Sequence, residues 1–133
     1  MTKEELCNLA KQAMQNSYSP YSSCRVGAAL LAENGKVYLG ANIENASFSP
    51  TICAERSAFA AAVSAGERKF AALAVTGGKD GEINGAFYPC GVCRQVISEF
   101  CADDFPIYVL TKGEIISLTL GDLLPHSFSN EVM

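Results

Sequence analysis

The sequence predicts an α/β protein in which a mixed sheet of about five strands lies between layers of helices. One reason is that apolar, strand-like runs alternate with segments of helical periodicity, separated by Gly, Pro and Asn. A second reason is composition, because 49% of the 133 residues are hydrophobic and 18% are charged, which is typical of a globular chain. This length suits one hydrophobic core. We therefore expect a single domain over residues 1–133, folded as a three-layer α/β/α sandwich.

The first part of the chain predicts a helix followed by a β-hairpin. Residues 3–16 repeat apolar side chains at helical spacing. Two apolar runs follow at 26–32 and 37–41. The turn between them contains Asn34 and Gly35, which are residues that supply the positive φ angles of tight hairpin turns. We therefore expect the two runs to pair as antiparallel strands.

The rest of the chain alternates between helices and strands. The helix expected over 52–65 carries many alanines, which we interpret as a core-packing face, and Gly66 ends it. The further expected elements are a strand at 70–76, a loop at 77–85, a helix at 91–101, strands at 106–110 and 115–118, and a turn at 121–125. This alternation predicts helices on both faces of the sheet.

Charge and composition argue against several classes of partner. The chain has 10 basic and 14 acidic residues, a net charge of −4, and its cations are scattered. Nucleic-acid binders usually present a basic face, so we expect no nucleic-acid partner. No apolar run has the length of a membrane span, and the N-terminus lacks the apolar stretch of a signal peptide. Six cysteines without an export signal indicate a cytoplasmic protein whose cysteines bind metal or stay free.

Two short segments carry residues suited to chemistry, Cys53-Ala54-Glu55-Arg56 and Pro89-Cys90-Gly91-Val92-Cys93-Arg94. Catalytic zinc takes three protein ligands and leaves its fourth position for water. Cys53, Cys90 and Cys93 supply three thiolates, and Glu55 follows the first of them by two residues. Zinc deaminases that act on nucleobases have this pattern, with the Glu as general acid and base. The sequence therefore predicts a catalytic zinc site with Glu55 as the proton carrier.

Arg56 is expected to tune the charge of this site. All three cysteines are expected at helix N-termini, where the helix dipole favours thiolates, with Cys90 and Cys93 on one face of the same helix. Three thiolates outweigh the charge of Zn²⁺ and weaken it as a Lewis acid. A guanidinium that donates to a thiolate offsets this excess. The alternative is that Arg56 faces solvent.

The cysteines also allow two alternative roles. Cys90 and Cys93 alone are typical of a redox pair or of half a structural zinc site. A structural site needs a fourth protein ligand, but the sequence has no second Cys-x-x-Cys pair, and its one histidine, His126, lies in the tail. The neighbouring Glu55 and Pro89 favour the catalytic site.

The chain resembles the small cytidine deaminases of nucleoside salvage over about residues 6–128. The matching stretches are Pro20-Tyr21-Ser22, Val26-Gly27-Ala28-Ala29-Leu30, Asn42-Ile43-Glu44-Asn45-Ala46, Cys53-Ala54-Glu55-Arg56, Pro89-Cys90-Gly91-Val92-Cys93-Arg94-Gln95-Val96-Ile97 and Leu123-Leu124-Pro125. The resemblance implies the cytidine-deaminase fold and one zinc ion per subunit. It also implies hydrolytic deamination of cytidine or 2′-deoxycytidine, in pyrimidine salvage, to the uridine nucleoside and ammonia.

The resemblance further implies roles for residues outside the zinc motifs. Asn42 and Glu44 are expected to hold the ribose and its 3′-hydroxyl, and the backbone at Ala54 is expected to contact the base. Phe128, in the C-terminal tail, is expected to help close the pocket. The family is typically a homotetramer whose pockets borrow residues from neighbouring subunits, so we expect a homotetramer that acts on a small nucleoside.

Three positions depart from the usual family pattern and leave the fine substrate preference open, including tolerance of bases modified at N4. Cys24 stands where Phe is common, Phe48 where Tyr is common, and Tyr88 where Ser is common. A small Cys24 predicts a roomier pocket beside the base, unless this side chain points into the core. Two other functions also stay open. One is deamination of a blasticidin-type aminonucleoside antibiotic, against which the ribose-binding stretch argues. The other is a zinc-binding module without catalytic activity.

Overall fold

A five-stranded sheet of order β2-β1-β3-β4-β5 forms the middle layer of the computed structural model, which describes residues 1–133. The strands are β1 (Cys24–Ala32), β2 (Val37–Ala41), β3 (Phe70–Lys79), β4 (Pro106–Leu110) and β5 (Ile115–Thr119). Strands β3 and β4 are parallel, and every other neighbouring pair is antiparallel. The predicted mixed sheet is confirmed.

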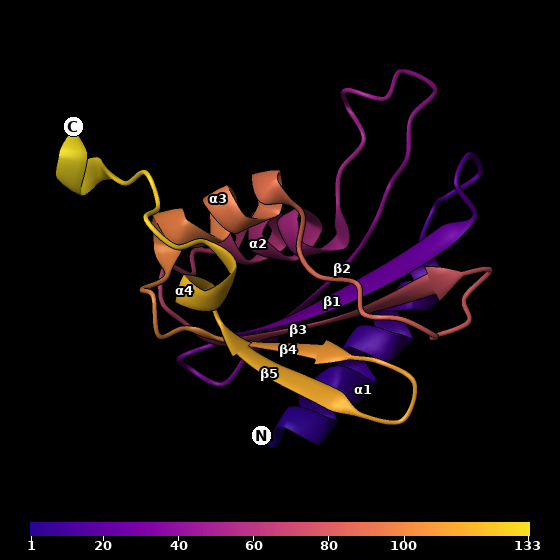
Figure 1. Ribbon diagram of the computed structural model, residues 1–133, viewed down its shortest axis with the longest axis horizontal. Helices are drawn as coiled ribbons and strands as arrows, with labels where there is room; N and C mark the ends of the chain where they lie inside the picture. The colour runs from indigo at the N-terminus through magenta and orange to yellow at the C-terminus, as the bar shows by residue number, and fades with distance from the viewer.

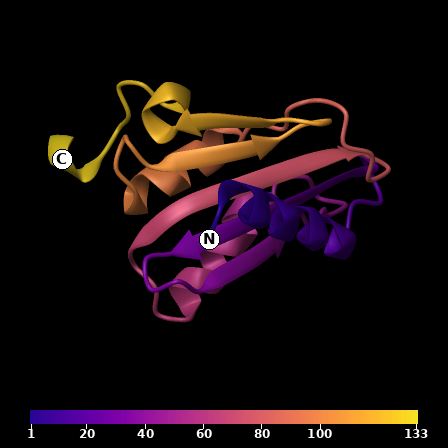
Figure 2. The ribbon, with the colours of Figure 1, turned by 90° about the horizontal axis from the view of Figure 1, so that it is seen from below.

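Helices cover both faces of this sheet, as the alternation of elements predicted. Helix α1 (Lys3–Ala13) lies across one face and continues into the 3₁₀ turn η1 (Met14–Asn16) (Figure 2). On the other face lie α2 (Ala54–Ser64), α3 (Gly91–Phe100) and the short α4 (Leu120–Leu123) (Figure 1). The tail then ends in the 3₁₀ turn η2 (Asn130–Val132). None of the helices combines the length and the hydropathy that a membrane span requires.

Each face of the sheet has its own hydrophobic core. The smaller core packs α1 on the sheet through Leu6, Cys7 and Ala10, which contact small residues of β1 and β3. The larger core lies under α2, α3 and α4, and its fully buried side chains include Phe59 and Ile97. Because the central strands are covered on both faces, their sequences are continuous apolar runs without polar alternation.

Gly40 allows the N-terminal half of α2 to lie close to the sheet. A Cβ atom at this position would lie 2.3 Å from the carbonyl oxygen of Ala54 and 2.4 Å from the amide nitrogen of Ala58. Ala54, Ala58 and Ala62 are buried, so the expected alanine face does pack in the core. This close contact between backbones sets the position of the first turn of α2, which carries the first zinc motif.

Several boundaries differ from the sequence-based expectations. Strand β1 begins at Cys24 and β3 continues to Lys79 because these two residues pair with each other, so residues 77–79 are strand and not loop. Helix α1 stops at Ala13. Helix α2 starts at Ala54 because Ile52 forms a bridge to an earlier segment of the chain.

Two turns also differ from the prediction. In the β1–β2 hairpin only Gly35 has a positive φ angle, 93°, so Asn34 does not contribute one. The segment expected as a turn at 121–125 instead begins within helix α4, which is only four residues long. Thr119 caps this helix, and its hydroxyl accepts a hydrogen bond from the Asp122 amide at 3.2 Å.

Candidate active site

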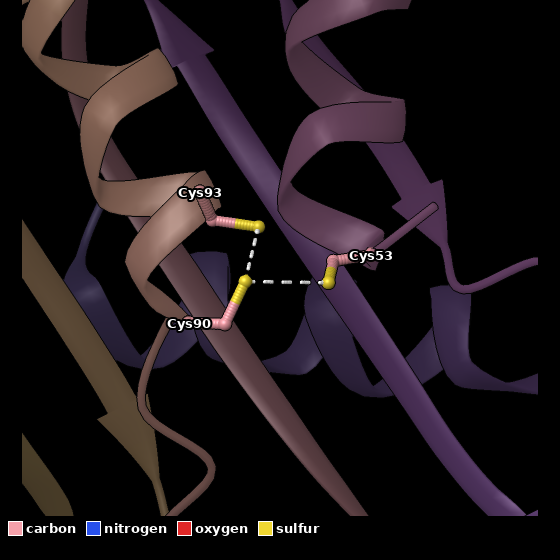
Figure 3. A group of neighbouring side chains, drawn as sticks. All are labelled: Cys53, Cys90 and Cys93. Carbon is pink, nitrogen blue, oxygen red and sulfur yellow. Dashed lines mark hydrogen bonds between the residues drawn. The ribbon is translucent and has the colours of Figure 1, made fainter. Parts of the chain in front are cut away.

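Three cysteines from two helices meet above one face of the sheet (Figure 3). Cys53 is the N-cap residue of α2, Cys90 is the N-cap residue of α3, and Cys93 lies in the first turn of α3. The Cys90 sulfur lies 3.6 Å from that of Cys53 and 3.5 Å from that of Cys93, and all three sulfurs lie within 4.8 Å of one another. Tetrahedral zinc with Zn–S bonds of ~2.3 Å holds its sulfurs about 3.8 Å apart. The donor set and its spacing therefore fit zinc.

The cluster contains three donors, as a catalytic zinc site requires. His126 is exposed in the tail and does not belong to the cluster. All six cysteines are free thiols, and Cys90 and Cys93 are not joined as a disulfide. This arrangement favours an open catalytic site over a structural zinc site.

Arg56 is partly buried and contacts the cluster. Its Nη2 lies 3.6 Å from the Cys53 sulfur and 3.4 Å from the carbonyl oxygen of Thr51, and its Nε is buried without a hydrogen-bond partner. Hydrogen bonds from Cys93 and from Arg56 lower the pKa of Cys53 to about 5. The guanidinium therefore adds to the stabilisation of the Cys53 thiolate, which is the contact that a charge-tuning role for Arg56 requires.

The contact between Arg56 and Cys53 leads to a prediction for Arg56→Gln. We expect this variant to keep its metal, because all three thiols remain, and to lose about tenfold in kcat at neutral pH, because removing a nearby charge shifts the pKa of the attacking water by ~1 unit. Metal analysis and a pH–rate profile test this expectation. The acid limb should move to higher pH, and a profile identical to that of the wild type would contradict the role of Arg56.

Glu55 is a buried carboxyl group beside the cluster. Only 4% of its surface is exposed, and it lines the same cavity as Cys53 and Cys90. Burial raises the pKa of Glu55 to about 7, and the charge of the Cys53 thiolate adds to this shift. A carboxyl group that titrates near neutral pH is suited to accept a proton in one step and return it in the next.

The cavity beside Glu55 measures about 280 Å³ and contains most of the residues that the sequence indicated. Its lining includes Cys24, Asn42, Glu44, Cys53, Ala54, Glu55, Tyr88 and Cys90. Cys24 therefore belongs to the pocket and does not point away into the core. An adjoining cavity of about 310 Å³ shares Glu44 and contains Phe48, which is 77% exposed.

Phe128 is not brought to this cavity by its own chain. Its side chain is 62% exposed, its carbonyl oxygen accepts a hydrogen bond from Gln95 Nε2 at 3.0 Å, and it does not line the pocket. Figure 1 shows the C-terminal tail leading away from the body of the domain. Within one chain, therefore, the expected closure of the pocket by this aromatic ring does not occur.

The side chain of Asn42 is held by neighbouring groups and is only 8% exposed. Its Oδ1 accepts hydrogen bonds from the Val26 amide at 3.0 Å and from the Ser17 hydroxyl, and its Nδ2 donates to the Cys24 carbonyl at 2.9 Å. Both acceptor positions of Oδ1 are thus filled, and one N–H group remains. Asn42 can offer a ligand only a donor.

Glu44 offers a ligand only acceptors. Its Oε1 accepts from the amides of Tyr21 at 3.0 Å and Ser22 at 3.1 Å, and its Oε2 accepts from the Ser22 hydroxyl at 2.5 Å. These bonds, with that of the Ser22 side chain as the largest cause, lower the pKa of Glu44 and keep the carboxylate ionised.

Several pocket residues were not identified from the sequence. Val26, Thr51 and Phe87 line the cavity, and the serines Ser17 and Ser22 hold Asn42 and Glu44. The segment Pro20-Tyr21-Ser22 is one of the stretches that resemble the family, which indicates that it contributes to the site. Nothing in its residue pattern indicates which carboxylate its serine contacts.

Comparisons with known proteins agree with this geometry. The model of the cytidine and deoxycytidylate deaminase zinc-binding region matches residues 1–109. The chain is 50% identical over 132 residues to a cytidine deaminase of Sporosarcina psychrophila, which covers 98% of this chain and 94% of the relative. It is 43% identical over 134 residues to a cytidine deaminase of Halalkalibacterium halodurans, which covers 100% of this chain and 98% of the relative. The crystal structure of cytidine deaminase from Burkholderia pseudomallei is similar with a TM-score of 0.89 at 43% identity, covering 96% of this chain and 100% of that one. The chain therefore belongs to the zinc-dependent cytidine and deoxycytidylate deaminase family.

Proposed function

We infer that this chain is a zinc-dependent enzyme that hydrolyses cytidine and 2′-deoxycytidine to the uridine nucleosides and ammonia. This inference is carried by a buried carboxyl group, Glu55, which lies beside a cluster of three thiols and lines the same cavity as two of them. We assign Cys53, Cys90 and Cys93 as the ligands of one zinc ion per chain. Pyrimidine salvage in the cytoplasm is the setting that this reaction fits.

Glu55 is proposed to carry protons through the whole reaction. When bound, zinc supplies a water molecule of lowered pKa. Glu55 accepts a proton from the attacking water and passes it to ring N3, which makes C4 of the base electrophilic. After attack at C4, Glu55 accepts the remaining proton of the former water from the new C4 hydroxyl and delivers it to the amine as the C4–N bond breaks, so one carboxylate acts as base and as acid. Its burial excludes competing water from these transfers.

The sugar is proposed to bind between Asn42 and Glu44. A hydroxyl group can accept one hydrogen bond and donate another. The free N–H of Asn42 and the ionised carboxylate of Glu44 complement both functions of one hydroxyl, which we take as the 3′-hydroxyl. Ala54 lies in the first turn of α2, where backbone N–H groups lack helical partners, and its amide is free to contact the base.

We further propose a homotetramer in which each tail contributes to a neighbouring pocket. Phe128 is exposed and does not line the cavity of its own chain, and large apolar side chains such as Phe48 and Ile43 are also exposed. A neighbouring copy that covers these side chains would bring Phe128 to its cavity. This arrangement supports the role expected for Phe128 in pocket closure.

A substrate panel tests the proposed function. Purified protein is supplied separately with cytidine, 2′-deoxycytidine, cytosine, and an aminonucleoside antibiotic of the blasticidin type, and ammonia release is measured. We expect turnover of the two nucleosides and little of the free base, because the sugar contacts are lost. Turnover of the antibiotic alone would indicate the related antibiotic deaminases, and zinc without any turnover would indicate a non-catalytic module.

The small side chain of Cys24 leads to a prediction about the size of the base that the pocket accepts. Replacing Cys24 with Phe places an aromatic ring beside the base, and aromatic contacts add ~0.5–1.5 kcal/mol beyond burial, so cytidine should bind up to about tenfold more tightly. The same ring should reduce tolerance of bases substituted on the exocyclic amine. Values of kcat/KM for cytidine and for an N4-alkyl or N4-acyl cytidine, with melting temperatures, test this. A variant that loses stability but keeps the wild-type ratio of the two substrates would refute the pocket role.

A further inference from the structure

Ser22 donates hydrogen bonds to one carboxylate, that of Glu44, from both its backbone amide and its side-chain hydroxyl. Its amide donates to Glu44 Oε1 at 3.1 Å, and its hydroxyl donates to Glu44 Oε2 at 2.5 Å. The same hydroxyl oxygen accepts a hydrogen bond from the Cys24 amide at 3.0 Å. Because that amide occupies the oxygen's acceptor side, the hydroxyl proton is directed toward Glu44. The Tyr21 amide completes the set at 3.0 Å from Oε1.

This arrangement leaves Glu44 with little remaining capacity to accept hydrogen bonds from a ligand. An ionised carboxylate has about four acceptor positions, two on each oxygen. The two amides fill those of Oε1, and the Ser22 hydroxyl fills one of Oε2. One acceptor position remains, on Oε2. Its direction depends on Ser22, because the serine hydroxyl is the group that determines which side of Oε2 stays free.

Glu44 also depends on Ser22 because of its place in the fold. It lies in the irregular connection between β2 and α2, outside any helix or strand, and its side chain is only partly buried. A long carboxylate in such a segment has many accessible rotamers. Ser22 and Glu44 both line the cavity beside the cluster and the adjoining cavity, so the pair stands where the two meet.

We propose that Ser22 is a positioning residue for sugar recognition: it holds Glu44 so that the single free acceptor position of Oε2 meets the 3′-hydroxyl of the substrate. The preference for substrates with this hydroxyl then depends on a residue that need not touch the sugar itself. The proposal rests on the proposed function, because it assigns Glu44 to the ribose. The lowered pKa of Glu44, to which the Ser22 side chain contributes most, agrees with it.

The test compares 2′-deoxycytidine with 2′,3′-dideoxycytidine, which differ only in the 3′-hydroxyl. In Ser22→Ala we expect the preference for 2′-deoxycytidine, as a ratio of kcat/KM values, to fall about tenfold, as for the loss of a hydrogen bond to a charged group. The change should appear in KM for 2′-deoxycytidine, with kcat little altered. Ser22→Thr keeps the hydroxyl and should restore most of the preference, whereas Ser22→Val, of the same shape, should not.

Ser23→Ala is the matched control, because the Ser23 hydroxyl makes no hydrogen bond and lies outside the cavity beside the cluster. It should keep the wild-type ratio, and melting temperatures should show that the variants are folded. The proposal is overturned if Ser22→Ala and Ser22→Val both keep the wild-type preference, or if Ser22→Thr behaves as Ser22→Val does. A wild-type enzyme without any preference for the 3′-hydroxyl would instead overturn the assignment of Glu44 to the ribose, and an absence of turnover would overturn the proposed function itself.

Discussion

Glu55→Gln should keep the fold and the zinc but lose activity by at least 10²–10⁴-fold, the usual contribution of general acid–base catalysis. The amide has nearly the size of the carboxyl group but cannot carry protons. Glu55 lines the cavity without being one of the three cysteine donors, so metal binding should not depend on it. Steady-state kinetics with cytidine and metal analysis of the same preparation measure both effects.

Glu99→Gln is a matched control, because Glu99 is an exposed carboxylate of α3 outside the cavity. It should leave kcat unchanged. Retention of a tenth of the wild-type kcat in Glu55→Gln would show that another group carries the protons.

Cys90→Ala should abolish zinc binding and turnover and should lower stability. Two thiols remain of a cluster of three, too few for the catalytic site. A ligand that binds only the native state stabilises it by about 4 kcal/mol when present at about 1,000 times its Kd, and the variant forfeits this contribution. Metal content per chain and thermal unfolding, with and without added zinc, measure the two effects.

Cys101→Ala separates the loss of metal from the loss of a thiol. Cys101 packs against the larger core, outside the cluster, and burial raises its pKa to about 12. Its removal should lower the melting temperature but leave one zinc per chain and the response to added zinc intact. Stoichiometric zinc in Cys90→Ala would exclude Cys90 from the ligand set.

The order of helices and strands was predictable because each element carries its own local signal. Apolar runs defined the strands, and helical periodicity with Gly66 at the end defined α2. The predicted element boundaries were wrong where a contact between distant segments determines the local secondary structure. Residues 77–79 look like a glycine-rich loop, but pairing of Cys24 with Lys79 makes them strand.

The thiol cluster was predictable because its cysteines are concentrated in two short motifs, and the sulfurs of Cys53, Cys90 and Cys93 do lie together. The contact of Arg56 with Cys53 followed from spacing, since the two residues are neighbours in the first turn of one helix. The hydrogen bonds between Ser22 and Glu44 did not follow, because they join two irregular segments whose relative position is set by the whole sheet. A local sequence pattern cannot predict a contact of this kind.

The proposed mechanism requires zinc in the thiol cluster for the deamination of cytidine beside Glu55. The most direct measurement follows cytidine loss, uridine formation and ammonia release by the purified protein, first as isolated, then after removal of the metal by a chelator, and then after zinc is restored. We expect equimolar uridine and ammonia, loss of turnover on chelation, and recovery when one zinc ion per chain is added back. Turnover that persists after the metal has been removed completely, or zinc-loaded protein that leaves cytidine unchanged, would contradict this mechanism.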